Sequence, residues 1–163
     1  MSIGYPEKGE HMSEAQRIAE ELRQAFEGPA WHGPAVRALL ADVSAEKAAA
    51  RPLANTHSIW EIALHIAAWE DVVRRRLAGE VIVDVADDQD WPPVRDPDAE
   101  AWQRTQRHLE QTNRALREAI AKFDDARLVD RVPGKDHSVY VMLHGLIHHD
   151  LYHAGQIALL RKA

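Results

Sequence analysis

Apolar residues recur at helical spacing along most of this 163-residue chain, and this periodicity restricts the fold more than any other feature. Residues three and four positions apart lie on one face of an α-helix, so the repeat predicts helices with one buried face. The pattern occupies four long segments, at residues 13–26, 58–77, 98–122 and 138–160. No segment alternates between apolar and polar residues as a strand does. We therefore predict an all-α fold, a four-helix bundle.

Helix boundaries are marked by capping residues. Ser58 and Glu61 have the spacing of a capping box and precede an apolar stripe, so a helix should begin there and end at Gly79. Ser138 should cap the last helix, and shorter helical pieces are predicted at 34–43 and 44–50. The helix at 98–122 carries apolar residues at the seven-residue interval of left-handed helix packing, at Trp102, Leu109, Leu116 and Phe123.

The segment between the second and third long helices is unusually long for a simple turn. Residues 80–97 contain Trp91-Pro92-Pro93 and Pro97, so they cannot form one continuous helix. At roughly 3.3 Å per extended residue, this segment can run the length of the bundle. We therefore predict a long crossover that leaves helices 58–77 and 98–122 parallel, and helices 58–77 and 138–160 antiparallel.

Composition limits the class of protein. The length suits one domain at residues 13–163, preceded by a mobile extension at 1–12 that lacks periodicity. The absence of cysteine excludes disulfides and thiolate ligands from the protein itself. The net charge of -6 argues against nucleic acid as a partner. The basic run Arg74-Arg75-Arg76 ends a predicted helix, where positive charge complements the helix dipole. Without a membrane-spanning run or signal pattern, we expect a cytoplasmic protein with no membrane partner.

Histidines on the last helix form a candidate metal site. His149 and His153 are one turn apart, about 40° around the helix, in the same sector as its apolar residues. His65 lies at the edge of the apolar stripe of helix 58–77 and is the natural third ligand. A second pair, His144 and His148, has the same spacing but points more than about 100° away. Burial therefore favours His149 and His153.

Three neutral imidazoles would bind a divalent metal such as Zn²⁺ or Ni²⁺ and leave at least one coordination position open. An open position can activate water or a thiol. With ordinary pKa values near 6.5, the three rings would exchange metal for protons below about pH 6. From spacing alone, two core histidines with satisfied nitrogens explain the pair equally well.

Two segments carry a family resemblance. His149-Asp150-Leu151-Tyr152-His153-Ala154-Gly155-Gln156-Ile157, together with His65 in the segment 58–66, resembles the DinB/YfiT-like superfamily. Trp31-His32-Gly33-Pro34 and Asp90-Trp91-Pro92-Pro93 are similar to segments in one branch of it. The resemblance covers the chain from about Ser13 onward. It implies a bundle with the crossover topology, a metal site at His65, His149 and His153, and a homodimer.

Four further residues stand near the candidate ligands. Asp150 lies in the apolar sector, where an unpartnered carboxylate is costly; it either orients a ligand histidine or, as we expect, pairs with a tryptophan N–H or a lysine. Glu61 is one turn from His65, but capping accounts for it. Tyr152 and Gln156 flank the histidine pair and either hold substrate or are simply half-exposed.

Two classes of function follow. Relatives in the superfamily include bacillithiol S-transferases and a mycothiol-dependent maleylpyruvate isomerase, so the resemblance implies a metal-dependent transferase that joins a low-molecular-weight thiol to a small electrophile. A hydrolase using metal-bound water is a variant of this hypothesis. The other class is a non-catalytic, stress-related module for metal binding or dimeric interaction. An enzyme should keep one coordination position of the metal open for substrate, whereas in a non-catalytic module a fourth side chain should close it.

Overall fold

The computed structural model describes residues 12–163, so the extension predicted at 1–12 lies, Met12 apart, outside the described residues. The described residues form helices and no β-strand, which confirms the all-α class. None of these helices has the length and hydropathy needed to cross a membrane. The helices are α1 (Glu14–Glu27), α2 (Val36–Leu40), α3 (Ala45–Ala49), α4 (Ile59–Leu77), α5 (Asp87–Asp90), α6 (Ala99–Ala121), the 3₁₀ helix η1 (Asp125–Arg127) and α7 (Val139–Leu160).

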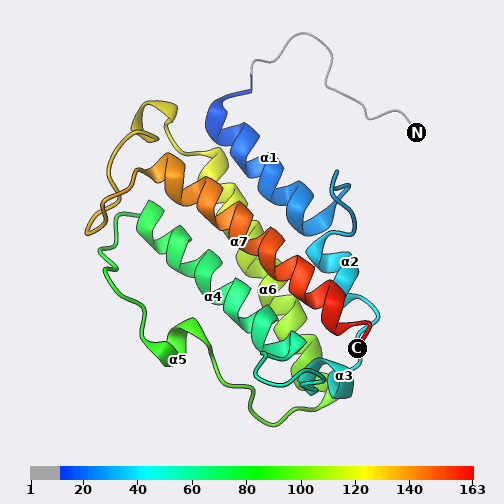
Figure 1. Cartoon of the computed structure of the whole chain (residues 1–163). Helices are drawn as coiled ribbons and strands as arrows, with labels where there is room; N and C mark the ends of the chain where they lie inside the picture. The colour runs from blue at the N-terminus through cyan, green and yellow to red at the C-terminus, as the bar shows by residue number, and fades with distance from the viewer. Residues whose placement is uncertain (1–11) are drawn as a thin grey trace.

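Four long helices, α1, α4, α6 and α7, lie side by side (Figure 1). Each contacts two of the others, because α4 packs on α6 and α7, and α1 packs on the same two helices. In Figure 1, α4 and α6 run in one direction while α7 runs opposite, in agreement with the expected crossover. The connection between α4 and α6 passes along the outside of the helices and carries the single turn α5.

Capping residues set the helix boundaries as their spacing predicted. The Ser58 side chain accepts from the backbone N–H of Glu61, and the Glu61 carboxylate accepts from the backbone N–H of Ser58. Ser138 caps α7 in the same manner through Val141 N–H. These bonds satisfy amide groups that have no partner inside the helix, which is why α4 and α7 begin at these residues.

A buried polar layer interrupts the apolar core. Apolar clusters fill the space on either side of it, and at its level each of α4, α6 and α7 contributes one polar residue: Glu70, Asn113 and Asp150, all at most 1% exposed. Asn113 Nδ2 donates to Glu70 Oε1 at 2.6 Å. Because Asp150 directly follows His149, the layer adjoins the histidine site described next.

Candidate metal centre

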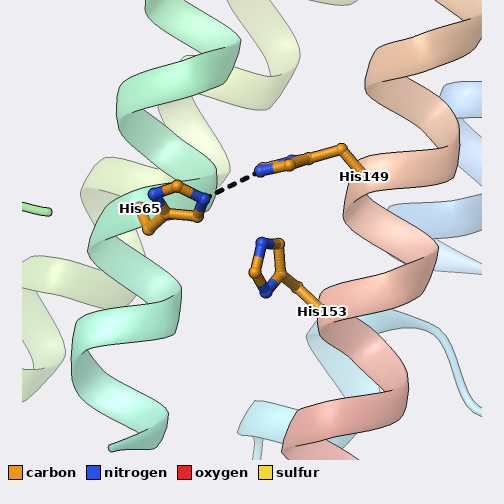
Figure 2. A group of neighbouring side chains, drawn as sticks. All are labelled: His65, His149 and His153. Atoms are coloured by element: carbon orange, nitrogen blue, oxygen red, sulfur yellow. Dashed lines mark hydrogen bonds between the residues drawn. The ribbon is translucent and has the colours of Figure 1, made fainter. Parts of the chain in front are cut away.

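Three histidines converge between the first half of α4 and the middle of α7. His65 projects from α4, and His149 and His153 project from α7 toward it (Figure 2). One ring nitrogen of each lies within 4.8 Å of the others, so the group can hold a metal ion. The alternative pair lies elsewhere, since His144 Nδ1 is 3.8 Å from Glu21 and His148 is exposed.

Hydrogen bonds select the same tautomer in all three rings. The Nδ1 atom of His65 is 2.6 Å from the Asp90 carbonyl oxygen, and that of His153 is 2.7 Å from Gln156 Oε1. In His149, Nδ1 is 3.2 Å from Asp150 Oδ1. Oxygen acceptors require a donating Nδ1–H, so a neutral ring then presents the lone pair of its Nε2. This is how outer groups usually orient metal-binding histidines.

The spacing of two Nε2 atoms also suits a metal. Nε2 of His65 and Nε2 of His149 are 2.9 Å apart, the contact marked in Figure 2. Two bare lone pairs repel at this separation, so a cation or a shared proton between them is favourable. A divalent ion takes imidazole nitrogens at roughly 2.0–2.1 Å, and these two Nε2 atoms are close enough together to share one ion. The donor set therefore fits a divalent ion.

Burial prepares the rings for metal binding. It lowers the pKa of His65, an effect that the Asp90 carbonyl partly opposes. It also lowers the pKa of His153 to about 4, helped by the nearby His149. Both rings are therefore neutral at physiological pH and need lose no proton to a binding metal.

These shifts correct the expectation that three ordinary histidines would exchange metal for protons below about pH 6. In the unfolded chain His65 and His153 take up protons near pH 6.5, whereas in the folded protein they stay neutral to lower pH. The stability they contribute is present above about pH 6.5 and is lost as the pH falls toward 4. We expect zinc affinity to fall no more than about a hundredfold between pH 6 and pH 5, since His153, with its pKa of about 4, has no proton to lose there. Competition with a chromophoric chelator measures this; a thousandfold fall would show that all three rings titrate together.

The crossover closes one side of the histidine group. Trp91 stacks on His65, with ring centroids 3.8 Å apart and planes 7° from parallel, and His57 stacks on Trp91 at 3.5 Å. Asp90 Oδ1 accepts from Trp69 Nε1 at 2.6 Å and lies 3.2 Å from His65 Nδ1. The short turn α5 therefore places a carboxylate and an aromatic wall against His65 on α4.

Two pockets flank the histidine group. The first, about 340 Å³, includes His149, Trp69 and Arg76 in its wall. The second, about 350 Å³, includes His153, Trp91 and Tyr152. Both have mostly apolar walls with a few polar groups, the usual character of small-molecule sites. The centre can thus be reached from the His149 side and from the His153 side.

The four neighbouring residues singled out in the sequence have different places. Asp150 Oδ1 contacts His149 Nδ1, where it can orient that ring, and among residues 12–163 no bond from Asp150 to a tryptophan or lysine is found; Trp69 N–H is taken by Asp90. Gln156 holds His153. Tyr152 is exposed at the rim of the second pocket. Glu61 caps α4 and pairs with Arg51, away from the ligand nitrogens.

Sequence reasoning missed several groups near the site. Glu70 and Arg76 lie one turn before and one turn after the core residue Val73, so their apolar surroundings were a detectable signal. Arg76 is buried, which corrects the view that the whole basic run serves the helix dipole. Asp90 and Trp91 lie in a segment without apolar periodicity, so only the family resemblance of Asp90-Trp91-Pro92-Pro93 drew attention to them.

The fold and site define an all-α protein with a largely buried three-histidine group reached from two pockets. The model of the DinB superfamily matches residues 30–157, well over half of the chain. The chain belongs to the DinB superfamily. Searches of curated proteins and of solved structures found no match to it.

Proposed function

We propose that this protein is a metal-dependent enzyme in which His65, His149 and His153 hold one divalent ion, Zn²⁺ or Ni²⁺. The observation that carries the proposal is the convergence of three imidazoles, two buried and one half-buried, each with its Nδ1 held by an oxygen, between two pockets. Purely structural zinc sites have four protein ligands, and three leave room for a substrate.

The reaction proposed is transfer of a low-molecular-weight thiol to a small electrophile. When bound, the metal would lower the pKa of a thiol at its open position. Neutral histidine ligands would leave the charge of the ion available for that thiolate. The pockets beside His149 and His153 would admit the two substrates separately. The transfer forms a sulfur–carbon bond, releases the thiol proton and expels the leaving group with its electron pair.

Metal-loaded protein should catalyse this transfer with a suitable thiol. The test uses 1-chloro-2,4-dinitrobenzene with a panel of thiols and follows the thioether by absorbance, in wild type and His153→Ala. We expect metal-dependent turnover in the wild type, reduced at least about 100-fold in the variant. Equal rates in both proteins for every thiol would contradict thiol transfer.

The competing proposal is a non-catalytic metal-binding module. Replacing the metal with Co²⁺ separates the two, because cobalt absorption reports its ligands. For an enzyme, adding the active thiol should change the cobalt spectrum through a new sulfur ligand. A spectrum unchanged by every thiol would favour the module, in which the protein closes the metal shell.

We also propose a homodimer. The outer face of α7 exposes apolar side chains, with Val141 55%, Tyr152 66% and Leu159 66% accessible. Such residues spaced along one helix face are typical of a contact surface. Light scattering at micromolar concentration should give about twice the chain mass of 18.4 kDa. A mass near that of one chain over the whole concentration range would contradict a stable dimer.

A further inference from the structure

Arg76 is a buried cation without a carboxylate partner among residues 12–163. The Arg76 residue is only 6% exposed. The two preceding arginines do have carboxylate partners, because Arg74 pairs with Asp71 and Arg75 pairs with Glu80. Arg76 instead donates from Nε and Nη2 to the Ile82 carbonyl oxygen, at 3.2 and 2.8 Å. Neither of these two hydrogen bonds uses the third guanidinium nitrogen, Nη1. Burial lowers the pKa of this guanidinium, which reflects the cost of an uncompensated charge.

This cation lines the first pocket, whose remaining wall is largely apolar. The pocket holds about 340 Å³ and is bounded by Trp69, Val73, Met142 and Leu146. Arg76 Cζ lies 5.9 Å from the Trp69 ring, and that ring lies 6.1 Å from the ring of His149. One small ligand resting on Trp69 can therefore reach from the guanidinium to the edge of the histidine group.

We propose that this pocket binds a small organic carboxylate, with its carboxylate on Arg76 and its apolar body on Trp69 beside His149. A guanidinium matches a carboxylate through paired, charge-assisted hydrogen bonds, and a buried anion would offset the unpaired charge of Arg76. The apolar wall favours a body such as an aromatic ring over a highly hydrated anion. Binding of the carboxylate needs no metal and is independent of the proposed function. Only the role of this ligand as a substrate rests on the proposed function.

The test measures binding of benzoate and of its neutral analogue benzamide to metal-free protein by isothermal titration calorimetry. Wild type should bind benzoate at least about tenfold more tightly than benzamide, as expected for charge-assisted hydrogen bonds. Arg76→Gln should lower benzoate affinity to the benzamide level. The matched control Arg75→Gln removes a half-exposed arginine that pairs with Glu80 and should leave benzoate binding unchanged.

A second variant covers the case in which Arg76→Gln does not fold. Gly145 lines the same pocket, and a Cβ added there meets no atom within 4 Å. Gly145→Leu should therefore fold, since leucine favours helix over glycine, and should block benzoate. Absence of saturable benzoate binding in wild type, or binding that survives Gly145→Leu, would overturn the proposal. His153→Ala should lose the metal but still bind benzoate. The failure of the metal site can therefore be distinguished from the failure of the carboxylate site.

Discussion

His149→Ala and His153→Ala are each expected to reduce bound zinc from about one equivalent per chain to background. Each substitution removes one of three converging nitrogens and leaves a two-histidine site. Because loss of an outer-shell partner alone costs roughly 10–100-fold in metal affinity, loss of a ligand should cost more than about 100-fold. Elemental analysis after dialysis gives the stoichiometry, and chelator competition gives the affinity.

The matched controls are His144→Ala and His148→Ala. They remove histidines with the same spacing on the same helix, but neither belongs to the converging group. Both should retain wild-type zinc content. Zinc lost equally from all four variants would indicate a general effect on α7 instead of ligation, and full zinc in His149→Ala and His153→Ala would refute the site.

Glu70→Gln is expected to stabilise the metal-free protein at pH 8, by about 1–3 kcal/mol, the usual cost of a buried polar group without a partner. Glu70 Oε2 and Asp150 Oδ2 are both buried without a hydrogen-bond partner among the described residues. Burial raises the pKa of Glu70 well above its usual range, and the neighbouring Asp150 adds to this effect. The amide of glutamine is neutral, so the variant buries no charge at position 70. Its NH₂ group can donate to Asp150, and its oxygen can still accept from Asn113.

The pH dependence follows from the direction of the Glu70 shift. Its pKa is higher in the folded than in the unfolded protein, so the stability of the neutral form is present below the unfolded pKa and is lost as the pH rises. The advantage of Glu70→Gln should therefore be small near pH 5 and larger at pH 8. Thermal unfolding in the presence of a chelator measures it, with the exposed Glu118→Gln as control. A variant less stable than wild type at pH 8 would show that Glu70 is ionised and satisfied.

Local patterns in the sequence determined the helices and the three histidines that could hold a metal. The Ser58–Glu61 capping box set the start of α4 because it satisfies amides within its own turn. The i, i+4 spacing of His149 and His153 placed both on one face of α7 because helix geometry is regular. His65 could be added because its helix carries a readable apolar stripe. All of these depend on residues close together in the chain.

The environment of those ligands was decided only by the tertiary structure. Asp90 and Trp91 reach His65 from an aperiodic crossover, whose path depends on packing against α4. Glu70 and Asn113 meet across two helices, and no local pattern specifies the partner of a buried polar side chain. Arg76 resembles its half-exposed neighbours Arg74 and Arg75 in sequence, yet packing buries it in a pocket wall. Burial and pKa are properties of surroundings assembled from distant segments, so they become visible only after the chain has folded.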